Sequence, residues 1–279
     1  MSNIVAVLTF GTNDHIHAPV DLAIKRCKTG LCNQLFRLIN VLVAHEPETN
    51  IIVLDVISAD YQTGQVLSAD TLLDLEKMNS IYHLNLQDIT KNKPTHYCIN
   101  NDEFIFRSCW HQPSEFAKRA KQIIFHERLI QTGRQLVEHF GLIGRLVNLV
   151  HLRVEDDMME HVGPTAAAKI LADYETQILQ FCQRDLPLVL LTGCEEHELI
   201  SKLRKEYSVI IASKCLALSF LNQGGERLDG REILAACDIT FAQHLMVNHF
   251  IGFGEGTARM SSFTMFIRTT IAHQHYHLV

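Results

Sequence analysis

The chain has 279 residues, 47% of them hydrophobic, which is enough for one large or two modest domains with a substantial core. Its net charge of −6 and the lack of a Lys/Arg run argue against nucleic acid as a partner, because a duplex binder needs a basic stripe to neutralise phosphates. The sequence shows no signal peptide, no apolar stretch of the ~18 residues that a membrane span needs and no paired CxxC motif, so we expect a cytoplasmic protein.

Apolar runs alternate with helical periodicity in the first half of the chain. Leu31, Leu35, Leu38 and Leu42 recur at three- and four-residue spacing and so share one helix face. Residues 60–110 carry only weak patterns. The pattern predicts strands at residues 4–10 and 51–57, a helix at 30–46 and a mostly helical segment at 114–140.

A second alternation begins near residue 146. Strands are predicted at residues 146–154, 187–192, 209–212 and 247–253. Helices are predicted at residues 164–184, 195–207, 231–244 and 259–272. Strands that alternate with helices predict parallel sheets covered on both faces. We therefore predict an α/β protein with two Rossmann-like domains, residues 1–145 and 146–279, and a cleft between them.

One predicted strand ends in charged residues. Arg153 follows the apolar run at 146–152, and Glu155 and Asp156 come directly after it. Ligands of open α/β sheets bind beyond the carboxyl ends of the strands, where an arginine can fork onto phosphate oxygens. The alternative is that Arg153 only pairs with a neighbouring carboxylate at the surface.

The start of the helix predicted at 30–46 offers a second candidate site. Gly30 permits a tight turn, and the free N–H groups of a helix start attract anions. Asn33 adds an amide that can contact a ligand. An ordinary helix start with exposed amides is the alternative.

A glycine-rich loop at residues 252–258 leads into a helix that bears hydroxyl groups, Ser261 and Ser262. Such a loop can cradle a phosphate on its backbone N–H groups, or it can be a flexible loop in which serine caps the helix. Asp238 lies upstream in an otherwise apolar helix and therefore needs a partner. That partner is either a nucleobase or ribose of a ligand or an arginine of the protein.

Three short motifs occur in a fixed order. They are Gly-x-x-Asn-Gln-Leu-Phe at 30–36, His-x-Arg-x-Glu-Asp at 151–156, and Phe-Ile-Gly at 250–252 followed by Ser-Ser-Phe-Thr at 261–264. Together they resemble the GDP-fucose-dependent fucosyltransferase superfamily, which includes protein O-fucosyltransferases and α1,2- and α1,6-fucosyltransferases. Cys32 stands where the family has glycine, and the loop before Ser261 is extended. Fucose on GDP is thus the default donor, with UDP-xylose or another nucleotide sugar as the alternative.

The resemblance implies a GT-B fold and an inverting, metal-independent transfer of a sugar from a nucleotide-diphosphate donor to a glycan or glycoprotein acceptor. By position, Arg153 would bind the β-phosphate and stabilise the leaving diphosphate. The donor-binding residues that the resemblance implies are Gly30, Asn33, Asp238, Ser261, Ser262 and Phe263. The resemblance implies no cofactor.

The sequence lacks the Asp-x-Asp triplet with which manganese-dependent sugar transferases hold a nucleotide diphosphate. We therefore expect arginine and helix dipoles to stabilise the leaving group, and no metal site. The alternating His273, His275 and His277 are expected in a surface or disordered tail rather than at a metal.

An inverting transfer needs one base to deprotonate the acceptor hydroxyl. Glu155, Asp156 and Asp14 are the candidates, Asp14 because the loop after the first strand should face the cleft. The altered position at Cys32 motivates an alternative function, a nucleotide-sugar-binding module without turnover.

Overall fold

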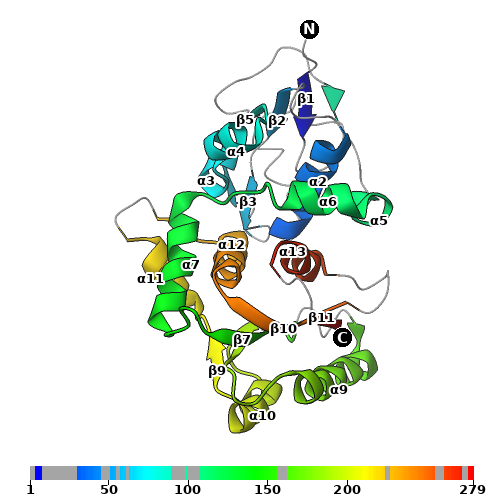
Figure 1. The fold of residues 1–279 in the computed structure, drawn as a ribbon, viewed down its shortest axis with the longest axis vertical. Coiled ribbons are helices and arrows are strands. Elements are labelled where there is room, and N and C mark those ends of the chain that lie inside the picture. Colours follow the sequence, from blue (N-terminus) through cyan, green and yellow to red (C-terminus); the bar gives the residue numbers. More distant parts are fainter. Residues whose placement is uncertain are drawn as a thin grey trace. The chain divides into compact units, whose positions relative to one another are not determined.

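The computed structural model describes residues 4–7, 30–44, 51–54, 57–60, 63, 65–88, 98–99, 107–155, 162–223, 227–254, 261–271 and 276–279. The chain forms two compact units. One comprises Met1–Gln131 with Gly224–Cys237, and the other comprises Thr132–Gln223 with Asp238–Val279. Each unit is built on a parallel sheet with helices, which confirms the predicted α/β class (Figure 1).

The units differ from the predicted ranges 1–145 and 146–279 because two segments belong to the unit other than the predicted one. Residues 132–145 belong to the second unit, where the Gly133 backbone lies against that of Thr240. Residues 224–237 belong to the first unit, where Glu232 accepts a hydrogen bond from the Leu31 amide. Both assignments depend on contacts between residues far apart in sequence, and local sequence patterns do not show such contacts.

The first unit contains a four-stranded parallel sheet in the order β5-β2-β1-β6 and a separate antiparallel pair, β3-β4. Its strands are β1 (Ile4–Val7), β2 (Ile51–Leu54), β3 (Ile57–Asp60), β4 (Gln65–Leu67), β5 (Leu86–Asp88) and β6 (Cys98–Ile99). Its helices are α2 (Leu31–Ala44), α3 (Ala69–Leu72), α4 (Leu75–Tyr82), α5 (Arg107–His111) and α6 (Pro113–Ala120). Helix α7 (Glu127–His139) begins in this unit and continues into the second.

The predicted leucine face of α2 is confirmed, since all four leucines are at most 1% exposed. Phe36 on the same helix meets Phe116 of α6 edge-on, with ring centroids 4.8 Å apart. The single strand predicted at 51–57 is wrong, because Ile57 begins β3 in another sheet. The segment predicted as mostly helical at 114–140 divides into α6 and α7. Backbone hydrogen bonds from Asp74 to Ile124 and from His126 to Leu72 hold the part between them extended.

The second unit contains a five-stranded parallel sheet in the order β11-β10-β7-β8-β9. Its strands are β7 (Leu146–His151), β8 (Leu188–Leu191), β9 (Val209–Ile211), β10 (Met246–Gly252) and β11 (Tyr276–Leu278). Its helices are α9 (Pro164–Phe181), α10 (Glu198–Glu206), α11 (Lys214–Leu221), the second half of α12 (Arg231–Gln243) and α13 (Ser262–Thr270). The four strands and four helices predicted here are confirmed, with bounds that differ by at most three residues, whereas α11 and β11 were not predicted.

The sheet of the second unit is covered on both faces. Val150 and Leu152 on one face pack with Tyr174 and Ile178 of α9 and with residues of α10. Helix α13 lies on the opposite face (Figure 1). No helix in the described parts of the chain combines the length and apolar character that crossing a bilayer requires.

The carboxyl-terminal residues form the edge strand β11, which pairs in parallel with β10. His277 is stacked on Phe181 of α9, with ring centroids 3.5 Å apart. The expectation of a surface or disordered tail is therefore wrong for this residue, while His273 and His275 lie outside the described residues. The strand escaped prediction because three residues are too few to show a periodic pattern.

Gly133 is expected to be required for the packing of α7 on α12. A Cβ atom at this position would lie 2.5 Å from the carbonyl carbon and oxygen of Thr240. Gly133→Ala should therefore destabilise the protein by about 1–3 kcal/mol, although alanine favours a helix by ~1 kcal/mol. Urea unfolding measures the change, with the exposed Glu138→Ala in the same helix as the control. A Gly133→Ala variant as stable as the control would contradict this packing.

Candidate functional site

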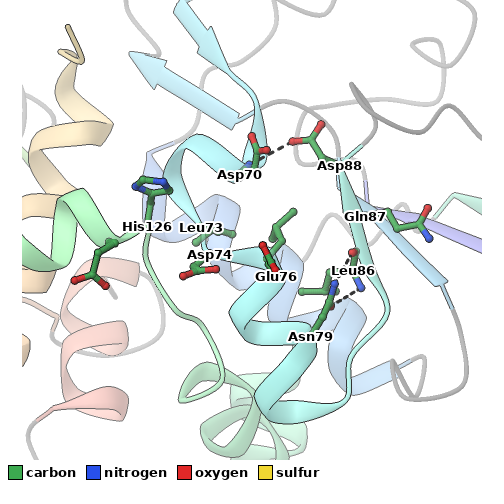
Figure 2. A pocket seen from close by; sticks show the side chains of 11 residues that line it. Asp70, Leu73, Asp74, Glu76, Asn79, Leu86, Gln87, Asp88 and His126 are labelled. Atoms are coloured by element: carbon green, nitrogen blue, oxygen red, sulfur yellow. Dashed lines mark hydrogen bonds between the residues drawn. The ribbon is translucent and has the colours of Figure 1, made fainter. Parts of the chain in front are cut away.

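The first unit contains an acidic pocket of about 440 Å³ beside α3, α4 and β5 (Figure 2). Five carboxylates contribute to its lining: Asp70, Asp74, Glu76, Asp88 and Glu127. Several of its polar groups already serve the fold. Asp74 caps α4 by accepting from the Lys77 amide at 2.9 Å, and Asp88 accepts from the Ser68 hydroxyl at 2.7 Å. None of the described predicted site residues lines this pocket.

Gly30 and Asn33 lie at the start of α2 in the first unit, as predicted. The backbone N–H of Asn33 donates to the Gly30 carbonyl at 3.0 Å in the first turn. The amide of Leu31, the first residue of α2, donates to the Oε2 atom of Glu232 on α12. A carboxylate of the protein thus occupies part of the helix start that we expected to attract a ligand anion.

Glu232 is only 4% exposed. Burial raises its pKa to about 7, against the opposing effect of the hydrogen bond from Leu31. Cys32, at the position where the sequence departs from the fucosyltransferase motif, is buried in the same place. Burial and the nearby charge of Glu232 raise the pKa of the Cys32 thiol, so this side chain serves as a small apolar residue of the core.

The raised pKa of Glu232 predicts that the free energy of unfolding depends on pH. The ordinary pKa of 4.5 rises to about 7 on folding, so this group favours the folded state at low pH. Its contribution is fully present below about pH 4.5 and is lost as the pH rises to about 7. Glu232→Gln stays neutral, can still accept from Leu31, and should flatten this decline in the free energy of unfolding. Chemical denaturation across this pH range measures it, with Glu115→Gln on the surface of α6 as the control. A variant with the wild-type slope would show the assignment to be wrong.

The strand order of the second unit contains a switch point. The chain proceeds from β7 to β8 and β9 on one side of the sheet and then returns to place β10 and β11 on the other side. The order therefore reverses between β7 and β10, and such a switch point is where open α/β sheets bind ligands. Arg153 and Glu155 follow β7 at this edge, and Phe253 follows β10.

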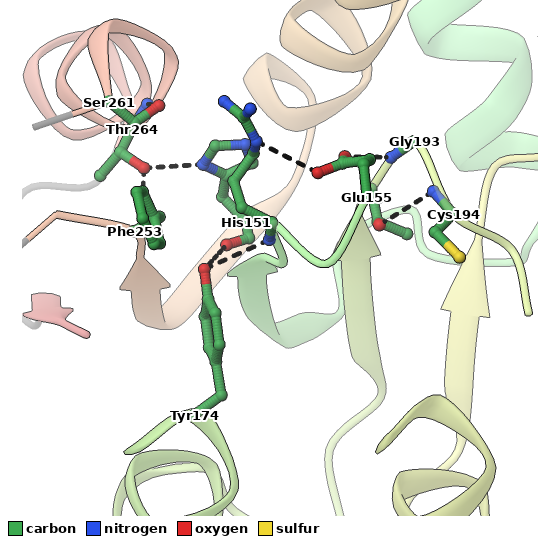
Figure 3. Close-up of polar contacts among 10 residues, drawn as sticks. His151, Glu155, Tyr174, Gly193, Cys194, Phe253, Ser261 and Thr264 are labelled. Atoms are coloured by element: carbon green, nitrogen blue, oxygen red, sulfur yellow. Dashed lines mark hydrogen bonds and ion pairs between the residues drawn. The ribbon is translucent and has the colours of Figure 1, made fainter. Parts of the chain in front are cut away.

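Thr264 of α13 joins three segments at the switch point (Figure 3). Its Oγ1 atom lies 2.7 Å from Nδ1 of His151 and accepts from the Phe253 amide at 3.0 Å. Its own amide donates to Ser261 Oγ at 3.4 Å, so Ser261 caps α13. The His151 ring lies against Phe263, with centroids 4.6 Å apart. The predicted residues Ser261, at the start of α13, and Phe263, within it, are thereby brought to the end of β7.

The backbone at Arg153 is held by a buried hydroxyl group. Tyr174 of α9 donates to the His151 carbonyl at 2.8 Å and accepts from the Arg153 amide at 3.3 Å (Figure 3). Burial, followed by the charge of Arg153, lowers the pKa of His151 well below its usual range. His151 is therefore a neutral imidazole at physiological pH, and Arg153 supplies the positive charge at this edge.

The side chain of Arg153 pairs with a neighbouring carboxylate, as the alternative interpretation of the sequence expected. Its Nε atom donates to Glu155 Oε2 at 3.1 Å, with side-chain exposures of 32% and 21%. Glu155 Oε1 accepts from the Gly193 amide at 2.9 Å. Because the bond to Glu155 uses Nε, it does not use the two terminal nitrogens of the guanidinium, which can fork onto an anion.

Asp238 lies on α12 in the same unit and is partly buried. Burial, then the nearby charge of Glu155, raises its pKa to about 7, while Lys214 opposes the shift. Asp238 is thus within electrostatic reach of the carboxylate that holds Arg153. Near neutral pH Asp238 is therefore present both as the protonated carboxyl group, which can donate a hydrogen bond, and as the carboxylate, which only accepts.

The predicted residues thus fall into three groups. Arg153, Glu155, Asp238, Ser261, Ser262 and Phe263 belong to the second unit, Gly30 and Asn33 to the first, and Asp14 and Asp156 lie outside the described residues. Sequence reasoning missed Glu232, Tyr174, Gly193 and Thr264 as partners of these residues. Only Thr264 carried a signal, since it ends the Ser-Ser-Phe-Thr motif.

The fold is that of known fucosyltransferases. The fucosyltransferase NodZ from Bradyrhizobium matches 97% of this chain and 94% of its own at a TM-score of 0.59 with 11% identity. NodZ α-1,6-fucosyltransferase soaked with GDP-fucose matches 97% of this chain and 93% of its own at 0.58 with 13% identity. POFUT1 in its apo form matches 99% of this chain and 97% of its own at 0.55 with 8% identity. POFUT1 in complex with GDP-fucose matches 90% of this chain and 95% of its own at 0.52 with 9% identity.

No protein-family model matches the sequence, and a search of curated proteins finds no match either. The likeness is therefore one of structure, extends over nearly the whole chain, and confirms the GT-B fold implied by the three sequence motifs.

Proposed function

We propose that this protein is an inverting, metal-independent glycosyltransferase that moves a sugar from a nucleotide-diphosphate donor to a hydroxyl group of a glycan or protein. Fucose on GDP is the default donor, since solved structures of this fold include POFUT1 in complex with GDP-fucose and NodZ soaked with GDP-fucose. The observation that carries the proposal is Arg153 at the switch point of the second sheet. Its terminal guanidinium nitrogens are not used by the contact with Glu155.

In the proposed reaction, Arg153 forks onto the diphosphate and stabilises the charge that develops as the sugar leaves. Ser261 and Ser262 stand at the start of α13, where N–H groups and hydroxyls suit a phosphate. Asp238, with a pKa of about 7, contacts the base or ribose of the nucleotide. The sequence lacks an Asp-x-Asp triplet, which supports charge stabilisation by these protein groups.

The acceptor hydroxyl needs a base. Glu155 already accepts hydrogen bonds from Arg153 and from the Gly193 amide, so each of its two oxygens has a partner within the protein. We therefore prefer Asp156 or Asp14 for this role.

A second candidate function is a nucleotide-sugar-binding module without turnover. The departure from the family motif at Cys32, which is buried at the start of α2, motivates it. Donor hydrolysis or transfer by the purified protein separates the two functions, since a binding module shows neither.

The donor can be identified by thermal denaturation with GDP, UDP, CDP, ADP and their sugars. A ligand that binds only the folded state stabilises it by RT ln(1 + [L]/Kd). We expect GDP and GDP-fucose to raise the melting temperature more than the other compounds do. A larger shift with UDP and its sugars would replace GDP by UDP as the donor base, and no shift with any of them would contradict both functions.

Arg153→Ala tests the catalytic assignment. Loss of a preorganised charge that meets the leaving group costs a few kcal/mol of barrier, so the rate of transfer should fall on the order of 10²–10³-fold. The free energy of unfolding should change little, since the pairing is partly exposed. Arg184→Ala, which removes an exposed arginine paired with Glu206, is the matched control. Near-normal turnover by Arg153→Ala would rule out the assignment.

A further inference from the structure

We propose that Glu155 is a positioning residue, which holds the Arg153 guanidinium in place from the fixed backbone amide of Gly193. This inference rests on the proposed function, because Arg153 is the group being positioned for the donor diphosphate. It gives Glu155 a role other than that of the base that deprotonates the acceptor.

The Glu155 carboxylate bridges two donors with its two oxygens (Figure 3). Oε2 accepts from Arg153 Nε at 3.1 Å, and Oε1 accepts from the Gly193 amide at 2.9 Å. The guanidinium is planar, so fixing Nε restricts the directions in which its two terminal nitrogens can point. The Glu155 carboxylate can thus orient the two terminal nitrogens of Arg153.

Both ends of this bridge are attached to adjacent strands. Arg153 follows β7 and Gly193 follows β8, which pair in parallel up to His151 and Leu191. The Leu152 amide then donates to the Leu191 carbonyl at 2.9 Å, which extends the pairing beyond the strands. The Gly193 amide is therefore a fixed point relative to the Arg153 backbone, and Glu155 transmits that position to the side chain.

Glycine at residue 193 permits the close approach of the Glu155 carboxylate. A Cβ atom there would lie 2.9 Å from Oε1 and 3.2 Å from Cγ of Glu155, too close for the carboxylate to keep its place. The described glycines with left-handed φ angles are Gly141, Gly144, Gly163, Gly230 and Gly254, so the backbone conformation of Gly193 does not demand glycine. Close approach of the Glu155 side chain is the reason that the structure supplies.

The bridge contributes little to folding stability, because both side chains are partly exposed to solvent. Its consequence lies in catalysis. A shift of a catalytic group by ~1 Å can cost about 100-fold in rate. A residue that aims Arg153 should therefore affect the transition state, where charge develops on the diphosphate, more than it affects donor binding.

Glu155→Gln changes the bridging carboxylate itself, and Gly193→Ala displaces that carboxylate from its backbone anchor. Each should lower kcat about 10- to 100-fold, change the KM for the donor less than about 3-fold, and leave the shape of the pH profile unchanged. The double variant should be no slower than the slower single variant, because both remove one interaction. Glu198→Gln, whose side chain is 84% exposed in the same unit, is the matched control and should keep wild-type kinetics.

Two kinetic results would overturn the proposal. One is wild-type kcat in Glu155→Gln. The other is a Glu155→Gln variant that loses the acidic limb of the pH profile while Gly193→Ala retains near-normal kcat. That second pattern would make Glu155 the base instead of a positioning residue.

The bridge can also be observed without any donor. The NMR signal of the Arg153 Nε–H group, assigned by its absence from Arg153→Lys, should move in both Glu155→Gln and Gly193→Ala and stay in place in Glu198→Gln. A signal that does not move would overturn the positioning role. A signal that moves, in a protein that neither binds nor turns over any nucleotide sugar, would instead contradict the proposed function.

Discussion

The central place of β7 in the second sheet is the constraint on which the candidate site depends. β7 lies between β10 and β8, and the strand order reverses between β7 and β10. A parallel strand buried on both faces is mostly apolar, so charged side chains are expected where it ends. Arg153 is the first charged residue after that buried run, and it emerges where the neighbouring connections diverge.

The groups around Arg153 serve the fold and the proposed chemistry together. Tyr174 fixes its backbone, Glu155 its side chain, and Thr264 ties His151 to the start of α13. Most of these contacts pair a charged or polar side chain with a neutral hydroxyl or a backbone amide. Tyr174 and Thr264 orient their partners without adding charge. Glu155 adds a negative charge beside Nε of Arg153, and its contact does not use the two terminal nitrogens of the guanidinium, which can meet an anionic ligand.

Helix α12 contributes a carboxylate with a raised pKa to each unit. Glu232 meets the start of α2 in the first unit, and Asp238 lies near Glu155 in the second. In both cases burial is the largest cause that raises the pKa to about 7. A carboxyl group with such a pKa changes charge near neutral pH, a property more common at functional sites than in ordinary cores.

Local pattern by itself determined the α/β class, the leucine face of α2, most elements from β7 to α13, and Arg153 as the residue at the end of a buried strand. These features are readable because periodicity and strand ends are properties of neighbouring residues. Only the tertiary structure decided that Glu155 reaches the Gly193 amide and that Glu232 occupies the start of α2, 201 residues away from Leu31. Such contacts depend on strand order and helix packing, which bring distant residues together without leaving a periodic signal in the sequence.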